Sequence, residues 1–355
     1  RLGFPRFFFL SNDELISILS HTKDFDKIQE SMQKLFEYVN SIDVTSEFLI
    51  THMNDAEGEK VELINGINGD TPEIEDWLNS FEEEMKNTLK ENTLKALETH
   101  NSMSKKQWFS EYPAQTVLIA SQLIWTSQVT QSFKTTKANR LNLLQQKYLD
   151  LLDQLTDLIR QPISHLLRQL ISSMLINQVH NRDIINQLIE GNASDENDFK
   201  WTKQLRYYVE NGTSIVVKSI NNCFEYSYEY AGNSTRLVIT PLTDRCYQTL
   251  LAAFKQFLSG APSGPAGTGK TETVRDCAKA LGRPCVVYNC SEEVTPEQMS
   301  QFFAGLSSSG SWSCFDEFNR INIEVLSVIA QQVRSIQEAI SSNSETFKLD
   351  ARTLK

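Results

Sequence analysis

The chain has 355 residues, which suggests two or three domains, and its 40% apolar and 22% charged residues are typical of a globular protein. The net charge of −11 argues against a general nucleic-acid surface, which needs clustered Lys and Arg. No apolar run approaches the roughly 18 residues of a membrane helix, and no signal-peptide pattern opens the chain. We therefore expect neither nucleic acid nor membrane as a partner.

Residues 1–200 carry apolar side chains mainly at helical spacing, and their connections, such as 65–70, are polar. Helices with such extensive apolar faces must bury them against one another. We therefore predict an all-α bundle that acts as a lever, scaffold or docking element. The predicted helical segments are 12–19, 27–39, 74–99, 116–129 and 141–190, the last broken near Pro162.

The spacing of apolar side chains changes after residue 200, where three short segments have the alternating pattern of strands. Residues 205–209 and 214–218 flank a turn at 210–213, and residues 224–230 alternate aromatic and polar side chains. We assign 201–235 to a strand-rich junction. A further strand is predicted at 237–240, before Pro241, and a helix at 243–258.

A phosphate-binding loop follows, and it matches the pattern G-x-x-x-x-G-K-[ST] at every fixed position. Its glycines let backbone N–H groups curl around an anion, and a helix over 272–281 points its positive end at the phosphates. The Lys reaches the β- and γ-phosphates of ATP or ADP, and the last Thr binds Mg²⁺ through its hydroxyl. The predicted nucleotide contacts are Gly264, Pro265, Ala266, Gly267, Thr268, Gly269, Lys270, Thr271 and Glu272.

The segments after the loop alternate between strand and helix, as in an α/β domain with a parallel sheet. A strand at 284–289 and a helix capped by Thr295 precede a second strand that ends in Asp316-Glu317. Two adjacent carboxylates are usually surface charges, but here they follow an apolar strand at the Walker B position. Asp316 would then hold Mg²⁺ and Glu317 would activate the attacking water. Asn319 and Arg320 could contact a neighbouring module or a phosphate, or only local groups.

The P-loop segment 264–273 and the Walker B segment 314–321 resemble the first AAA+ module of dynein heavy chains. Segments 1–15, 108–115, 179–185 and 198–207 are similar to the dynein linker, so the likeness spans nearly the whole chain. Segments 237–240 and 325–332 look more like axonemal than cytoplasmic dyneins. The resemblance implies that Val238, Ile239, Pro241 and Leu242 form an apolar wall for adenine.

The resemblance implies a minus-end type of microtubule motor whose ATP cycle at the first module moves the linker. We accordingly expect a helical linker at 1–200, a junction at 201–235 and the large subdomain of an AAA+ module at 236–355. Implied partners are the other AAA+ modules, microtubules through a stalk, and intermediate and light chains with other axonemal complexes. The implied location is the cytoplasmic cytoskeleton, in the axoneme of a cilium or flagellum.

The family pattern also limits what this stretch can do. The chain starts without Met and ends before the sensor strand and the small helical subdomain, and the Arg finger would come from the next module. We therefore expect very slow ATP hydrolysis, or none, from the 355-residue chain alone. There are two alternatives to the motor function. One is another AAA+ remodelling ATPase, but such machines lack the linker-like segments. The other is a module that only senses ATP, which could dispense with Glu317.

Overall fold

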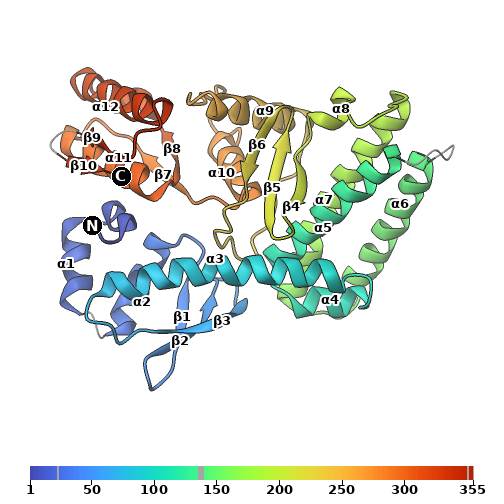
Figure 1. Ribbon diagram of the computed structural model, residues 1–355, viewed down its shortest axis with the longest axis horizontal. Coiled ribbons are helices and arrows are strands. Elements are labelled where there is room, and N and C mark those ends of the chain that lie inside the picture. Colours follow the sequence, from blue (N-terminus) through green and yellow to red (C-terminus); the bar gives the residue numbers. More distant parts are fainter. Residues whose placement is uncertain (22–23, 135–139, 350–351, 355) are drawn as a thin grey trace.

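The computed structural model describes residues 1–21, 24–134, 140–349 and 352–354. The fold is mixed α/β and mostly helical, and Figure 1 shows long helix α3 crossing the lower part of the molecule, with the strands β1, β2 and β3 below it. Helices α5, α6 and α7 lie at one end of α3, and the C-terminal elements lie above its other end. Within the described ranges, no helix is long and apolar enough to cross a membrane.

The predicted helices of the first 200 residues are confirmed within a few residues at their ends. The long helix over 74–99 is found with those bounds, and the stretch predicted at 141–190 is interrupted between residues 159 and 165, around Pro162. Ser11 is the N-cap of the first α-helix and forms a capping box with Glu14. The helices are η1 (Pro5–Phe9), α1 (Asn12–Ser20), α2 (Phe25–Leu35), α3 (Ile74–Thr99), α4 (Lys105–Glu111), α5 (Ala114–Lys134), α6 (Arg140–Ile159), α7 (His165–Glu190) and α8 (Phe199–Thr202).

The prediction that residues 1–200 are all-α is wrong, because they contain a three-stranded antiparallel sheet. The strands are β1 (Ser41–Val44), β2 (Leu49–Asn54) and β3 (Lys60–Asn68), in the order β1-β2-β3. Strand β3 includes most of the segment predicted to be a polar connection. It buries Val61, Leu63 and Ile67 in the core that also holds α3, while the residues between them face outward. The alternation was obscured by Asn and Gly residues near the end of the strand.

The predicted strands of the junction form a second antiparallel sheet, β4 (Arg206–Glu210), β5 (Ser214–Ser219) and β6 (Asn222–Glu225). Glu210 pairs with Ser214, so three residues connect β4 and β5. Asn211 and Gly212, the central residues of the turn that the Thr213 amide closes on Glu210 O, both have positive φ. The third strand ends earlier than predicted. Tyr228 has a φ of 56°, and the amides of Ser227 and Glu229 donate to carbonyls at the end of helix α10 rather than to a strand.

The last third of the chain has the predicted alternation around a small parallel sheet. Strands β7 and β8 pair in parallel, with Asn289 opposite Asp316. The strand predicted at 237–240 is not formed; there Thr240 caps α9, and Pro241 takes its first position. After residue 341 the described residues include two short strands, β9 and β10, that pair antiparallel. These elements are α9 (Pro241–Lys255), α10 (Lys270–Ala280), β7 (Cys285–Asn289), α11 (Pro296–Ser309), β8 (Trp312–Asp316), η2 (Phe318–Arg320), α12 (Ile323–Ser341), β9 (Phe347–Leu349) and β10 (Arg352–Leu354).

The two ends of the chain pack against each other (Figure 1). Gln301 on α11 donates to the backbone oxygens of Phe8 at 3.1 Å and Leu10 at 3.3 Å. The rings of Phe9 and Phe302 lie 5.5 Å apart, edge to face. The N-terminal aromatic segment therefore joins the helical part of the chain to the α/β part.

Replacing Thr295 by Ala should destabilise the α/β part by about 1 kcal/mol, the usual cost of losing an N-cap. Thr295 Oγ1 accepts from the backbone N–H of Gln298 at 3.3 Å, and Gln298 Oε1 accepts from the backbone N–H of Thr295 at 3.1 Å. Urea unfolding measures the change. Thr249→Ala, on the exposed face of α9, is the matched control and should stay within about 0.5 kcal/mol of the parent. Equal losses in the two variants would contradict this capping role.

Candidate functional site

The loop predicted to bind phosphate is an exposed turn that leads directly into α10. Gly267 and Gly269 have φ of 76° and 77°, and a Cβ at either position would meet nothing within 4 Å. Their left-handed backbone, rather than crowding, is therefore what favours glycine. Thr268 Oγ1 donates to Pro265 O at 2.9 Å and closes the turn.

Lys270 is the first residue of α10, so its backbone lies where the helix leaves unpaired N–H groups. Its Nζ donates to Gly264 O at 3.0 Å and to Pro265 O at 2.8 Å. The ammonium group thus lies folded over its own loop. A phosphate bound at the loop would offer charged oxygens in place of these neutral carbonyls, and the attraction between opposite charges would favour the exchange.

Thr271 and Asp316, which are 45 residues apart in the sequence, are in direct contact. Thr271 Oγ1 donates to Asp316 Oδ1 at 2.7 Å and Oδ2 at 2.9 Å. Asp316 ends β8, and its backbone oxygen accepts from the Cys290 amide at 2.9 Å beyond β7. The carboxyl ends of the parallel strands therefore meet the start of α10, as ligand sites of open α/β sheets require.

Glu317 follows Asp316 in an unusual backbone conformation, with φ of 53° and ψ of 37°. This left-handed geometry costs a non-glycine residue of order 1–3 kcal/mol and clusters at functional sites. The Glu317 side chain is 58% exposed, and its Oε2 lies 3.4 Å from Arg320 Nε. Arg320 therefore has a local partner, one of the alternatives left open by the sequence. An exposed pair of this kind contributes little to stability.

The two thiols nearest Asp316 are unreactive. Burial, with the charge of Asp316 next in size, raises the pKa of Cys290 to about 11. The same causes, in the same order, raise the pKa of Cys314. Both stay protonated near neutral pH, so neither is a candidate nucleophile.

The segment predicted to form the adenine wall is tied to α10 through Asp276. Arg236 Nε and Nη2 donate to the two Asp276 oxygens at 3.0 and 3.1 Å, and Tyr247 donates to the same carboxylate. Burial, followed by the Asp276 charge, raises the pKa of the Tyr247 hydroxyl well above its usual value. Of the predicted wall, Pro241 is exposed and Ile239 half-buried. Val238 and Leu242 are 66% and 72% exposed, which leaves apolar surface uncovered beside α9.

The family description "Hydrolytic ATP binding site of dynein motor region" matches residues 226–355, and "Dynein heavy chain, N-terminal region 2" matches residues 1–96. Dynein axonemal heavy chain 1 of Homo sapiens is 44% identical over 353 residues, which cover 99% of this chain and 8% of that protein. The chain belongs to the dynein heavy chain family. Dynein axonemal heavy chain 12 of Mus musculus is also 44% identical, over 357 residues that cover 100% of this chain and 12% of the relative. Dynein axonemal heavy chain 3 of Homo sapiens is 44% identical over 356 residues, which cover 100% of this chain and 9% of that protein.

This dynein chain thus spans about a tenth of the length of the relatives it matches. The matches confirm the resemblance to axonemal dyneins and a hydrolytic ATP-binding region within residues 226–355. They also set aside the rival of an unrelated AAA+ remodelling ATPase, because residues 1–96 match a region that is specific to dynein heavy chains by its description.

Two features of the dynein site were missed at the sequence level. Asp276 lies on the buried face of α10, where a carboxylate stands out among Val274, Cys277 and Ala278; that contrast could have indicated a buried ion pair. Its partner Arg236 lies 40 residues away and carries no local signal. Arg275, one position earlier, pairs with Glu37, which is 238 residues away.

Proposed function

We propose that this dynein chain binds ATP and Mg²⁺ at the P-loop and supplies the groups that hydrolyse the nucleotide. The observation that carries the proposal is the contact between Thr271 and Asp316. A hydroxyl at the start of the P-loop helix and a carboxylate at a strand end meet within hydrogen-bond distance. P-loop NTPases use these two groups together for Mg²⁺.

The donor set of this pair fits Mg²⁺. Thr271 and Asp316 both offer hard oxygen atoms, and Mg²⁺ commonly takes only one or two protein ligands beside phosphates and water. In the described part of the chain, no cluster of three or more His, Cys, Asp or Glu side chains could hold a metal ion without such help. When bound, Mg²⁺ neutralises charge that develops on the transferred phosphoryl group.

The remaining roles follow from position. Lys270 exchanges its two loop carbonyls for β- and γ-phosphate oxygens, while the backbone N–H groups of the loop from Gly264 to Glu272, other than at Pro265, surround the phosphates. Glu317 orients and deprotonates the attacking water. Its position directly after Asp316, where the end of β8 meets the start of α10, supports this role. Val238, Ile239, Pro241 and Leu242 cover one face of adenine.

Because the chain belongs to the dynein heavy chain family, the proposal extends to the whole heavy chain. The chain comprises a linker at 1–200, a junction at 201–235 and the large subdomain of the first AAA+ module at 236–355, whose complete form contains a larger parallel sheet. ATP turnover at this module moves the linker in a minus-end-directed microtubule motor of the axoneme. The motor works with its other AAA+ modules, a microtubule-binding stalk, and intermediate and light chains.

Lys270→Ala should weaken ATP binding about 10- to 100-fold, since a hydrogen bond to a charged group contributes roughly 1.5–3 kcal/mol. Isothermal titration of the 355-residue chain with ATP and Mg²⁺ measures the effect. Lys106→Ala, at an exposed position of α4, is the matched control and should bind as the parent does. The nucleotide assignment fails if the parent chain binds no ATP or if Lys270→Ala binds ATP with unchanged affinity.

A further inference from the structure

Helix α10 connects the P-loop to the linker and junction along its whole length. Its first residues are Lys270 and Thr271. At and just beyond its other end, three successive carbonyls accept hydrogen bonds from the junction. Tyr207 Oη donates to Ala280 O at 2.8 Å. The amides of Ser227 and Glu229 donate to Leu281 O at 3.0 Å and to Gly282 O at 2.8 Å.

Gly282 allows a ring of the junction to pack closely against this end of the helix. Its φ is 59°, and a Cβ on it would lie 2.6 Å from the Tyr226 ring. The ring therefore packs directly on the backbone where α10 ends. Tyr226 also accepts from Gln115 Nε2 at 2.8 Å, which ties the contact to linker helix α5.

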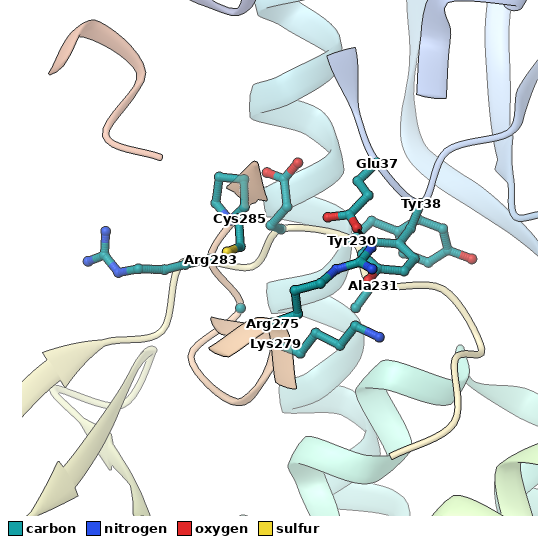
Figure 2. A pocket seen from close by; sticks show the side chains of 11 residues that line it. Glu37, Tyr38, Tyr230, Ala231, Arg275, Lys279, Arg283 and Cys285 are labelled. Atoms are coloured by element: carbon teal, nitrogen blue, oxygen red, sulfur yellow. Dashed lines mark hydrogen bonds and ion pairs between the residues drawn. The ribbon is translucent and has the colours of Figure 1, made fainter. Parts of the chain in front are cut away.

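The middle of α10 contacts the linker through charged side chains (Figure 2). Arg275 forms an ion pair with Glu37, just beyond the end of α2, and the two side chains are 30% and 35% exposed. The Lys279 ammonium lies 4.7 Å from the centre of the Tyr38 ring. These four residues line a small cavity of about 20 Å³, which has room for about one water molecule.

Arg275 also reaches toward the nucleotide site. Its Nη1 lies 3.3 Å from Glu272 Oε1, and Glu272 directly follows Thr271. A cavity of about 550 Å³ is lined by Thr271 and Asp316 on one side and by Glu37 and Arg275 on another. Arg275 is therefore shared between a linker carboxylate and a carboxylate at the phosphate end of the same helix.

We propose that Glu37 and Arg275 are positioning residues through which the linker sets the affinity of the P-loop for ATP. Arg275 lies four residues beyond Thr271, about 6 Å along the helix axis. Any displacement of Glu37 with the linker pulls on α10 or leaves Arg275 paired with Glu272 alone. By linkage, ATP bound at the P-loop must then change the strength of the Glu37–Arg275 contact by the same factor.

The test is a charge swap in a dynein heavy chain that carries this sequence with its other modules. Glu37→Arg and Arg275→Glu alone should each change the KM for ATP by about three- to tenfold, within the usual range of coupling between sites. The rate at saturating ATP should change by less than about twofold, because neither residue touches the reacting atoms. The double variant should bring KM back to within about twofold of the parent.

Arg334→Glu is the control. Arg334 pairs with Glu338 at 2.7 Å on α12, both side chains are exposed, and neither lines the cavities that Glu37 and Arg275 line. Its KM should match that of the parent. The inference is overturned if the single variants leave KM unchanged, or if the double variant does not restore it although its melting temperature equals the parent's. The inference rests on the proposed ATPase function. If the parent heavy chain shows no ATP turnover, the proposed function has failed; if the parent turns over ATP and only the swap has no effect, this inference alone has failed.

Discussion

Replacing Glu317 by Gln should lower the ATPase rate of a heavy chain carrying this sequence by about 10²- to 10⁴-fold, the usual contribution of a general base. The amide keeps the size of the side chain but cannot take a proton from water. Binding of ATP should persist, because the loop, Lys270 and the Thr271–Asp316 pair are untouched. Steady-state phosphate release measures the first quantity, and fluorescent-nucleotide binding the second.

Glu324→Gln provides the matched control, since Glu324 is an exposed carboxylate in the first turn of α12, only seven positions along the chain. Its ATPase rate should equal that of the parent. If Glu317→Gln hydrolyses ATP at the parent rate, Glu317 is not the base of this reaction. A loss of both binding and hydrolysis would instead show that Glu317 holds the site together.

The local parts of the site could be predicted because each depends on neighbouring residues. The P-loop spacing fixes which residues curl around an anion, and the apolar run before Asp316 predicts the strand that ends there. Thr295, Pro296 and Gln298 predict the start of α11 in the same way, and all three occupy the expected capping positions. Helix α3 was predicted with its observed bounds because its period persists over seven turns.

The non-local parts could not be predicted, since nothing near either residue indicates its partner. Arg275 and Glu37 are 238 positions apart, and Arg6 and Glu229 are 223 apart. The early end of β6 has the same cause: residues 226–230 keep an alternating pattern, but the amides of Ser227 and Glu229 donate to carbonyls at the end of α10. Strand β3 was missed for a different reason, because its alternation is interrupted by Asn65, Gly66 and Asn68, residues that favour turns.

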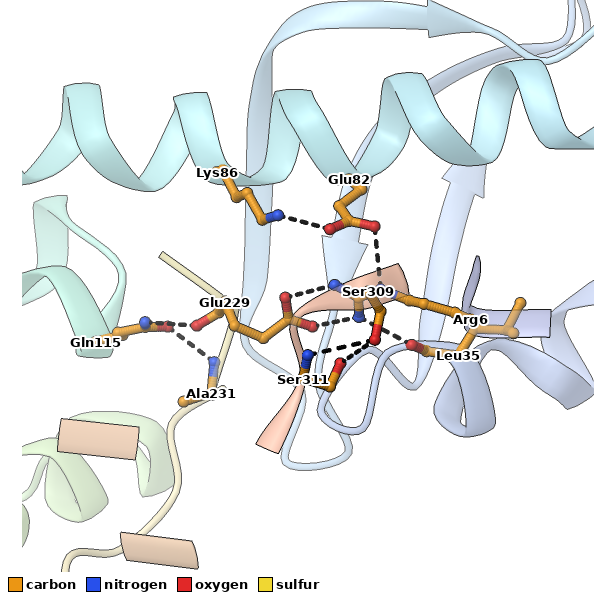
Figure 3. A network of polar contacts seen from close by, with 9 residues as sticks. All are labelled: Arg6, Leu35, Glu82, Lys86, Gln115, Glu229, Ala231, Ser309 and Ser311. Atoms are coloured by element: carbon orange, nitrogen blue, oxygen red, sulfur yellow. Dashed lines mark hydrogen bonds and ion pairs between the residues drawn. The ribbon is translucent and has the colours of Figure 1, made fainter. Parts of the chain in front are cut away.

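The most consequential of these distant contacts is made by Arg6, which is 3% exposed (Figure 3). Its Nη1 and Nη2 donate to the two oxygens of Glu229 at 2.6 and 2.7 Å, and Nε donates to Glu82 at 3.1 Å. Nη1 also donates to Leu35 O at 2.9 Å. Burial alone would lower the pKa of the guanidinium, but the two carboxylates raise it above its ordinary value. One cation therefore joins η1, the end of α2, helix α3 and the junction.

Arg6→Met should destabilise the chain by about 3–5 kcal/mol, because removing one partner of a buried ion pair leaves an uncompensated charge. That charge is Glu229, which is itself 6% exposed, whereas Glu82 keeps Lys86 at 2.6 Å. Urea unfolding followed by tryptophan fluorescence measures the loss. Arg160→Met is the matched control: its ion pair with Asp157 has both side chains 74% exposed, so the change should stay below about 1 kcal/mol.

A second set of variants tests whether Glu229 is the carboxylate that loses its partner in Arg6→Met. If the cost arises from Glu229, adding Glu229→Gln to Arg6→Met should recover much of the lost stability, because an amide is cheaper to bury than a carboxylate. Glu82→Gln added to Arg6→Met should recover little, since Lys86 already balances that carboxylate. Equal recovery by both, or a loss no larger than in Arg160→Met, would mean that apolar packing around η1, rather than the ion pair, fixes the linker to the junction. The Phe36 ring, 4.4 Å from the Arg6 guanidinium carbon, would then be the main contact to examine.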